Sequence, residues 1–299
     1  MRVALLGGGT IARLVLEHRP PGIEVSALVG RNPASRGASL AGEFGIPYMV
    51  GRAALLATRP QAVLEAASHE AVREHLVPLL EAGVHVVVLS AGALADDGLR
   101  RAAEAAASRS GALFYVPSGG IGGLDALKTA CLAGVDEVSI QVAKPPAAWK
   151  GIAYVEKTGI DLDRLKAAHV LFEGPAREGV PHFPQNVNIA AVLSLAGVGM
   201  DRTRLRVVAD PALTLNTHTI RVSGPRAASP WCWRMSRRRK IRRLPGSPAT
   251  APWPRCKRSA PAFATAPETV SLFLDQASEN PHNFGFRRRG ARAAKGGRL

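Results

Sequence analysis

Short apolar runs alternate with amphipathic stretches through the first 120 of the 299 residues. Each apolar run is long enough for one buried strand, and each amphipathic stretch repeats its apolar residues at helical spacing. This alternation predicts a parallel, doubly wound sheet, in which ligands bind beyond the carboxyl ends of the strands. The predicted strands are 2–6, 22–30, 62–68, 85–94 and 112–120, and the clearest predicted helices are 69–83 and 94–111.

The pattern changes after Gly120. A helix is predicted over 121–135, a strand over 136–146, a loop and a small-residue helix over 171–200, and two strands around a turn over 203–224. This order predicts an α+β arrangement with one open sheet. The fold class is therefore α/β, with a dinucleotide-binding Rossmann domain over 1–120 and a catalytic α+β domain over 121–224.

Composition narrows the class of protein further. No run of about 18 or more apolar residues is present, so the sequence predicts no transmembrane helix. The first residues lead directly into a structural motif without a signal-peptide cleavage region, which favours a cytoplasmic protein. The 3 cysteines are far apart and have no paired histidines nearby, so neither a disulfide framework nor a metal site is predicted.

Positive charge is concentrated at the end of the chain. The formal net charge is +16, and the residues 225–299 hold 17 of the 39 Lys/Arg but only 3 of the 23 Asp/Glu, hence +14 of that charge. A break this sharp near Gly224 marks a boundary. An Arg-rich tail with aromatic residues suits non-specific nucleic-acid binding. Nucleic-acid binding through this tail is therefore the alternative function from a different class, although the tail carries no recognisable binding motif.

A glycine-rich turn follows the first predicted strand. Gly7, Gly9 and Ala12 fit G-x-G-x-x-A, a pattern that is common by itself but here follows a strand and opens a helix. The first glycine permits a sharp turn, the second lets the backbone approach a pyrophosphate, and the alanine lets the helix pack closely. The helix N-terminus favours the phosphates. We therefore expect these residues to bind a dinucleotide, and the alternative is a plain structural turn.

The second predicted strand ends without the carboxylate that usually binds the ribose 2′-hydroxyl. Arg31 stands there instead. A carboxylate would repel the 2′-phosphate of NADP, whereas an arginine attracts it. We expect NADP to be accepted at least as well as NAD, and the alternative is a solvated loop arginine. The later strands end in small residues, at 66–68, 90–92 and 118–120, which leaves room for a flat nicotinamide ring and a small substrate.

Several stretches together resemble the L-aspartate dehydrogenase family, which uses NAD or NADP. They are 89–96 (LSAGALAD), 116–128 (VPSGGIGGLDALK), 144–151 (KPPAAWKG), 171–204, which contains FPQNVNIAA, and 207–222, which contains NTH. The resemblance covers about 1–224. It implies oxidation of L-aspartate to iminoaspartate, which hydrolyses to oxaloacetate and ammonia or enters NAD biosynthesis through quinolinate, and it implies a homodimer. The alternative within the same class is another aspartate-pathway or amino-acid oxidoreductase on this fold.

The resemblance also implies roles for individual residues. His218 matches the family's acid/base residue, and an imidazole titrates near neutral pH. Gly120 stands where the family usually has alanine and would contact the cofactor through its backbone. Asn188 would hydrogen-bond the nicotinamide amide. The candidates for binding the two substrate carboxylates are Lys144, Arg177 and His182.

Each of these roles has a structural alternative. His218 fits an ordinary polar position in a strand, Asn186 and Asn188 fit helix caps, and Lys144 fits a solvated position. Two further expectations are purely structural. The remaining histidines considered are expected to be structural or exposed, and a pair of aspartates is expected to start a helix: His69, His75, His85 and His169, and Asp96 and Asp97.

The tail departs from the family's ending, which is a strand, a loop with Asn-Pro-Lys-Thr-Ser and a final helix. Codons permitted by 230–265 can be chosen so that the neighbouring reading frame encodes these elements in that order. We therefore infer a frameshift between about Gly224 and Pro230, which makes 225–299 an aberrant, disordered tail. The missing strand is expected to leave the strand 217–222 as an exposed sheet edge, with a risk of aggregation and loss of activity.

Overall fold

The computed structural model describes residues 1–184, 186–224 and 231–236. A parallel six-stranded sheet forms the first lobe, in the order β3-β2-β1-β4-β5-β6. Its strands are β1 (Arg2–Leu6), β2 (Glu24–Gly30), β3 (Tyr48–Val50), β4 (Ala62–Glu65), β5 (His85–Val88) and β6 (Phe114–Tyr115). The chain leaves β1 toward β2 on one side and returns to β4 on the other, so the strand order reverses between β1 and β4. Ligands of doubly wound sheets bind at such a reversal.

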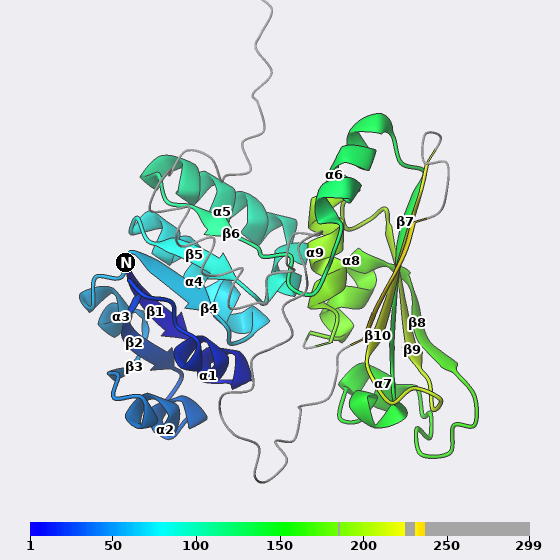
Figure 1. The fold of residues 1–299 in the computed structure, drawn as a ribbon, viewed down its shortest axis with the longest axis horizontal. Coiled ribbons are helices and arrows are strands. Elements are labelled where there is room, and N and C mark those ends of the chain that lie inside the picture. The colour runs from blue at the N-terminus through cyan, green and yellow to red at the C-terminus, as the bar shows by residue number, and fades with distance from the viewer. Residues whose placement is uncertain (185, 225–230, 237–299) are drawn as a thin grey trace, which may run out of the picture.

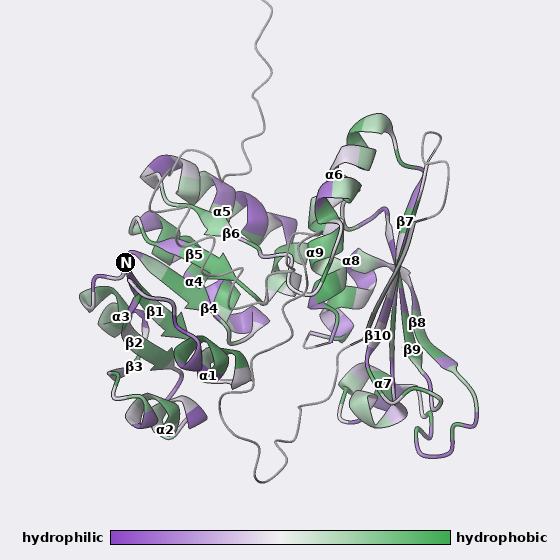
Figure 2. Cartoon of the chain, viewed as in Figure 1, coloured by the Kyte–Doolittle hydropathy of each residue, from purple (hydrophilic) through white to green (hydrophobic). Residues whose placement is uncertain are grey.

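Helices surround this sheet (Figure 1). They are α1 (Thr10–Glu17), α2 (Arg36–Glu43), α3 (Arg52–Ala57), α4 (His69–Glu81), the short 3-10 helix η1 (Ala91–Ala95) and α5 (Asp97–Ser110). Figure 2 shows apolar residues along the strands and hydrophilic residues concentrated on the helices around them. The Rossmann-type sheet predicted from the alternation is confirmed. The short elements α2, β3 and α3 were not predicted, because their apolar runs are too brief to show a period.

Two polar side chains cap helices where the sequence places them. The hydroxyl of Ser68 accepts the backbone N–H of Ala71 at the start of α4. The carboxylate of Asp96 accepts the N–H groups of Gly98 and Leu99 at the start of α5. The expectation that Asp96 starts a helix is therefore confirmed, and the reason is that a carboxylate satisfies amide groups which have no partner inside the helix.

A mixed five-stranded sheet forms the second lobe, in the order β11-β10-β7-β9-β8. Only β7 and β9 pair in parallel; the other neighbours are antiparallel. The strands are β7 (Glu137–Lys144), β8 (His169–Pro175), β9 (Thr203–Ala209), β10 (Thr217–Ser223) and β11 (Trp231–Ser236). The helical segments are α6 (Leu124–Ala133), η2 (Pro146–Trp149), α7 (Ala153–Lys157), α8 (Ala176–Gly179), η3 (Val180–His182) and α9 (Asn188–Ala196). The predicted open sheet is present, and β8 is a strand where a loop was expected.

One face of the second sheet is buried. Along β7 the residues Val138, Ile140 and Val142 are buried, while the alternating Ser139 and Gln141 are only half-buried. Figure 1 places α6, α8 and α9 between the two sheets, on this buried face. The core of the second lobe therefore lies between its sheet and the first lobe, and it includes residues from η1 of the first lobe.

The edge next to β10 is not exposed, contrary to the expectation from the sequence. Backbone pairing joins β10 to β11 from Thr217, opposite Ser236, to Val222, opposite Trp231. Unpaired N–H and C=O groups of an edge strand favour the addition of a further strand, and the segment 231–236 supplies one. The expectation of disorder from 225 onward is therefore wrong for 231–236, and the rest of the tail lies outside the described residues. Among the described residues no helix is long and apolar enough to cross a membrane.

Candidate functional site

The turn after β1 has the shape of a dinucleotide cradle. Gly7 has a φ of +103°, and a Cβ at this position would lie 2.7 Å from the carbonyl oxygen of Ala66. Its N–H donates to the carbonyl of Val29 at 2.8 Å, which holds the turn against β2. At Gly9, by contrast, a Cβ would meet nothing within 4 Å. The first glycine is thus required by the fold, while the second leaves open space at the N-terminus of α1, where a pyrophosphate would approach.

Two further contacts hold this turn in place. A Cβ at Gly8 would lie 2.2 Å from the Cα of Gly37, so the turn and α2 touch through two glycines. Ala12 is fully buried and packs in the core beneath the first sheet. The small side chain at position 12 lets α1 approach the strands closely, as the pattern predicts. The residues present therefore fit a dinucleotide.

Arg31 lies exposed just beyond the end of β2. The loop that carries it is held by Tyr48, whose hydroxyl donates to the carbonyl of Asn32 at 2.6 Å and contacts the hydroxyl of Ser35. Its backbone neighbour Gly30 has no room for a side chain, because a Cβ there would lie 2.1 Å from the Tyr48 hydroxyl. The arginine is therefore carried on a fixed loop at the place where a cofactor's adenine ribose lies in this fold.

A buried carboxylate, Glu65, lies at the end of β4 and is only 1% exposed. One oxygen accepts the N–H of Ala67 and the hydroxyl of Ser90, at 2.8 and 2.9 Å, and the other accepts the N–H groups of Leu89 and Ser90, at 3.2 and 2.9 Å. Burial raises the pKa of Glu65, and the four donated hydrogen bonds oppose that rise. Sequence reasoning missed this residue. The available signal is one carboxylate inside an apolar strand.

Asn188 joins the two lobes. Its Oδ1 accepts the N–H of Gly92 at 3.0 Å and contacts Nε2 of His69 at 2.9 Å. The backbone N-cap of α9 is Val187, and no side chain caps that helix. The alternative interpretation of Asn188 as a helix cap is therefore wrong. Asn188 contacts Gly92 in η1 and His69 in the first turn of α4 instead.

Lys144 ends β7 and is buried, with 6% of its surface exposed. Its ammonium donates to Oδ1 of Asn186 at 2.5 Å and lies 5.0 Å from the ring centre of Trp149. The alternative of a solvated lysine is therefore wrong. Trp149 is itself fully buried and donates to the carbonyl of Val208 at 3.1 Å, so the surface beneath the ammonium is rigid.

His218 shares a face of the second sheet with Lys144. The register of β10 places His218 opposite Val142, and Lys144 is two residues further along β7. Residues opposite one another in an antiparallel pair share a face, and so do residues two apart in a strand. His218 and Lys144 are therefore diagonal neighbours, about 7–8 Å apart at the backbone. Both lie on the buried face, with Ile140 and Ile220.

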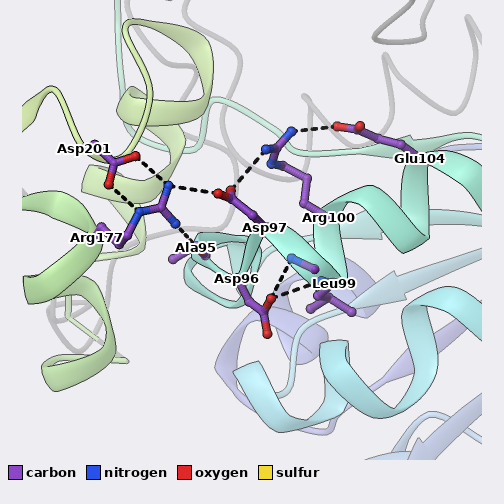
Figure 3. A network of polar contacts seen from close by, with 9 residues as sticks. Ala95, Asp96, Asp97, Leu99, Arg100, Glu104, Arg177 and Asp201 are labelled. Atoms are coloured by element: carbon purple, nitrogen blue, oxygen red, sulfur yellow. Dashed lines mark hydrogen bonds and ion pairs between the residues drawn. The ribbon is translucent and has the colours of Figure 1, made fainter.

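Arg177 is used to hold the lobes together (Figure 3). Its guanidinium forms paired hydrogen bonds with Asp201, bonds Asp97 at 3.1 Å and donates to the carbonyl of Ala95 at 2.7 Å. The hydrogen bonds with Asp201 raise the pKa of Arg177 and lower the pKa of the Asp201 carboxyl group. The pKa of Asp97 is lowered chiefly by its hydrogen bond with Arg100, and the charge of Arg177 adds to that effect. The donors of Arg177 are engaged by two aspartates and a backbone carbonyl, so Lys144 and His182 are the predicted ligands of the substrate carboxylates that remain.

The remaining predicted residues lie as follows. Exposed His182 stacks on Tyr154, with ring centres 4.4 Å apart, and so belongs to the aromatic group around η3. Gly120 is exposed in the turn that leads to α6. Half-buried His85 accepts the N–H of Leu113 at 3.0 Å, and partial burial lowers its pKa. Of the other histidines expected to be structural or exposed, His69 and His75 are buried and His169 is exposed.

Comparison with known proteins gives consistent matches over both lobes. A family model for the NAD binding domain of homoserine dehydrogenase matches residues 6–117, and one for the C-terminal part of aspartate dehydrogenase matches 125–252. L-aspartate dehydrogenase 2 of Bordetella bronchiseptica is 44% identical over 231 residues, which cover 75% of this chain and 84% of the relative. The chain belongs to the L-aspartate dehydrogenase family.

Two further relatives agree. The L-aspartate dehydrogenase of Pseudomonas aeruginosa is 37% identical over 227 residues, which cover 75% of this chain and 84% of the relative. The crystal structure of aspartate dehydrogenase from Thermotoga maritima superposes with a TM-score of 0.60 and 28% identity, covering 79% of this chain and 88% of that one. The resemblance inferred from the sequence motifs is therefore confirmed.

Proposed function

We propose that this chain oxidises L-aspartate to iminoaspartate with NAD or NADP as the acceptor. Asn186 and Asn188 carry the proposal. Asn186 binds Lys144 on the second sheet, and Asn188, two residues later, binds Gly92 and His69 at the ligand-binding edge of the first sheet. This short segment brings Lys144, which shares a sheet face with His218, next to the place where a nicotinamide lies in this fold. Family membership supports aspartate as the substrate.

The chemistry divides between the cofactor and the protein. A dinucleotide held at the turn of Gly7 and Gly9 would supply the acceptor for the hydrogen and electron pair that leave Cα of the substrate. His218 accepts a proton from the substrate ammonium, because the lone pair that this leaves on the substrate nitrogen is needed to form the C=N bond. Lys144 pairs with a substrate carboxylate and orients Cα. The products are iminoaspartate, reduced cofactor and one proton, and water then converts the imine to oxaloacetate and ammonia.

The replacement His218→Ala tests the acid/base role, with His169→Ala, an exposed position on β8, as the matched control. We expect kcat for L-aspartate to fall by roughly 10²–10⁴-fold in His218→Ala. Cofactor affinity, measured by calorimetry, should stay within about twofold. The control should keep both values. Near-normal turnover in His218→Ala would remove this residue from the mechanism.

The replacement Lys144→Met tests the carboxylate-binding role while it keeps most of the buried volume. Loss of a charge-assisted contact of about 1.5–3 kcal/mol should raise KM for L-aspartate by roughly 10–150-fold. Cofactor affinity should not change. Equal weakening of aspartate and cofactor binding would show that Lys144 supports the fold of the crevice and does not bind the substrate.

Several finer features belong to the same proposal. Arg31 binds the 2′-phosphate of NADP, so a wild-type affinity for NADP more than about tenfold weaker than that for NAD would contradict this role of Arg31.

The domain boundary lies near Gly120, between β6 and α6. The functional unit is a homodimer of the 31.5 kDa chain, as light scattering would test. Any nucleic-acid binding by the tail is non-specific and is lost at moderate salt.

A further inference from the structure

His69 is a buried residue at the first position of α4 to which the proposed mechanism gives no role. It is 4% exposed, and its Nε2 lies 2.9 Å from Oδ1 of Asn188, 119 residues away in the sequence. The same oxygen lies 3.0 Å from the backbone nitrogen of Gly92. Three segments of the chain therefore converge on one side-chain oxygen at the junction of the lobes.

These distances fix the hydrogen-bond roles. A backbone N–H can only donate, so the atom of Asn188 that faces Gly92 must be the carbonyl oxygen. Since that oxygen only accepts, Nε2 of His69 must carry a hydrogen and donate to it. Both lone pairs of the oxygen are then used. The amide nitrogen Nδ2 is the polar atom that Asn188 has left to offer, and it is a donor.

The neighbouring groups keep this arrangement rigid. A Cβ at Gly92 would lie 2.4 Å from Cε1 of His69 and 3.0 Å from Oδ1 of Asn188, so only glycine fits between them. Gly92 lies in η1, whose N-cap residue Ser90 is held by Glu65, which accepts its N–H and its hydroxyl. The donor N–H of Gly92 is therefore fixed to the carboxyl ends of β4 and β5.

We propose that His69 is a positioning residue: together with the N–H of Gly92 it orients Asn188, so that Nδ2 donates to the carboxamide oxygen of the nicotinamide. The inference rests on the proposed function, in which Asn188 contacts the cofactor. It adds the residue that sets the direction of that contact. A carboxamide held through its oxygen has one rotational state, so one face of the ring is presented to Cα of the substrate.

The test uses two variants of the full chain and two ligands. His69→Phe keeps a ring but has no donor, whereas His69→Gln keeps an N–H. The ligands are NAD and ADP-ribose, which lacks the nicotinamide, and affinities are measured by calorimetry without aspartate. We expect His69→Phe to lower the affinity for NAD by roughly tenfold and to keep the affinity for ADP-ribose within about twofold of wild type. His69→Gln should recover most of the lost NAD affinity.

Other outcomes overturn the inference. Unchanged NAD affinity in His69→Phe would show that the contact does not position Asn188, and equal loss of both ligands would show a purely structural role. If His69→Phe does not fold, Gly92→Ala places a Cβ 2.4 Å from the His69 ring and 3.0 Å from Oδ1 of Asn188, so it disturbs the same contact and should show the same selective loss. Failure of the wild-type chain to bind NAD would instead overturn the proposed function, and the inference with it.

Discussion

Gly7 and Gly9, in the turn after β1, should respond differently to alanine, because the structure gives each a different reason to be glycine. Gly7 has a φ of +103°, and its Cβ would lie 2.7 Å from a backbone oxygen. The left-handed conformation costs about 1–2 kcal/mol, and the overlap with backbone adds a similar amount. We expect Gly7→Ala to lower Tm by roughly 5–15 °C.

Gly9 differs from Gly7 both in its backbone conformation and in the space around a Cβ. Its backbone is extended, with φ −87° and ψ −168°, and a Cβ would meet nothing within 4 Å. Alanine should therefore change the stability little: the lost freedom of the unfolded chain favours it by about 0.4–1 kcal/mol, and this gain is offset because Gly9 is the N-cap of α1, where glycine is the better residue. The new methyl group would occupy the space that a pyrophosphate needs, so affinity for NAD and NADP should fall by at least about tenfold.

Thermal melts and calorimetric titrations of the same preparations separate the two effects. Gly42→Ala is the matched control, because its Cβ would also meet nothing within 4 Å, but it lies in α2. It should keep full cofactor affinity. Wild-type cofactor affinity in Gly9→Ala, or a wild-type Tm in Gly7→Ala, would refute this reading of the turn.

Three further predictions concern other parts of the chain. In Glu65→Gln an NH₂ group replaces one carboxylate oxygen, and this donor then faces the N–H and O–H groups that now donate to that oxygen. The free energy of unfolding, measured in urea titrations, should therefore fall by about 1–3 kcal/mol. Burial raises the pKa of Glu65 above the usual 4.5 that it has in the unfolded chain. The contribution of this shift to the stability of the folded protein is therefore fully present below pH 4.5, and it is lost as the pH rises through the pKa of the folded state. The advantage of the wild type over Glu65→Gln should therefore shrink as pH rises; an advantage that grows would contradict the direction of the shift. Arg177→Lys loses the paired contact with Asp201, and since the carboxylates are more than a third exposed the loss should be small, roughly 2–4 °C in Tm, and smaller at high salt. A salt-independent loss would mean that packing dominates at this position. Finally, the nucleotide sequence around codons 220–232 should yield the family ending after the insertion or deletion of one or two bases, and codons that cannot do so would refute the frameshift.

Most of the first lobe could be predicted from the sequence, because its buried strands are continuous apolar runs and its helices have caps and periodic faces. Asp96 illustrates this, since a carboxylate before an amphipathic stretch is a local signal. The short elements α2, β3 and α3 have no comparable signal. In the second lobe β8 was missed, because its pairing with β9 depends on a partner about thirty residues away.

The site was only partly predictable for the same reason. Gly7 and Gly9 belong to a local sequence pattern that predicts a sharp turn at the first glycine and open space at the second, and the structure has both. Arg177 has the charge that a substrate carboxylate needs, yet two aspartates from separate elements engage it. The contact between His69 and Asn188 spans 119 residues, so no local pattern could indicate it. The strand β11 was missed because composition suggested disorder, while the free edge of β10 favours pairing.

The most direct test of the account is the product balance of the full chain with L-aspartate. The purified protein is given L-aspartate with NAD or NADP, and reduced cofactor, oxaloacetate and ammonia are measured together, with homoserine as the comparison substrate. We predict that the three products form in equal amounts from L-aspartate, and that homoserine gives little or none. Cofactor reduction that does not depend on L-aspartate, or faster reduction with homoserine, would contradict the central claim.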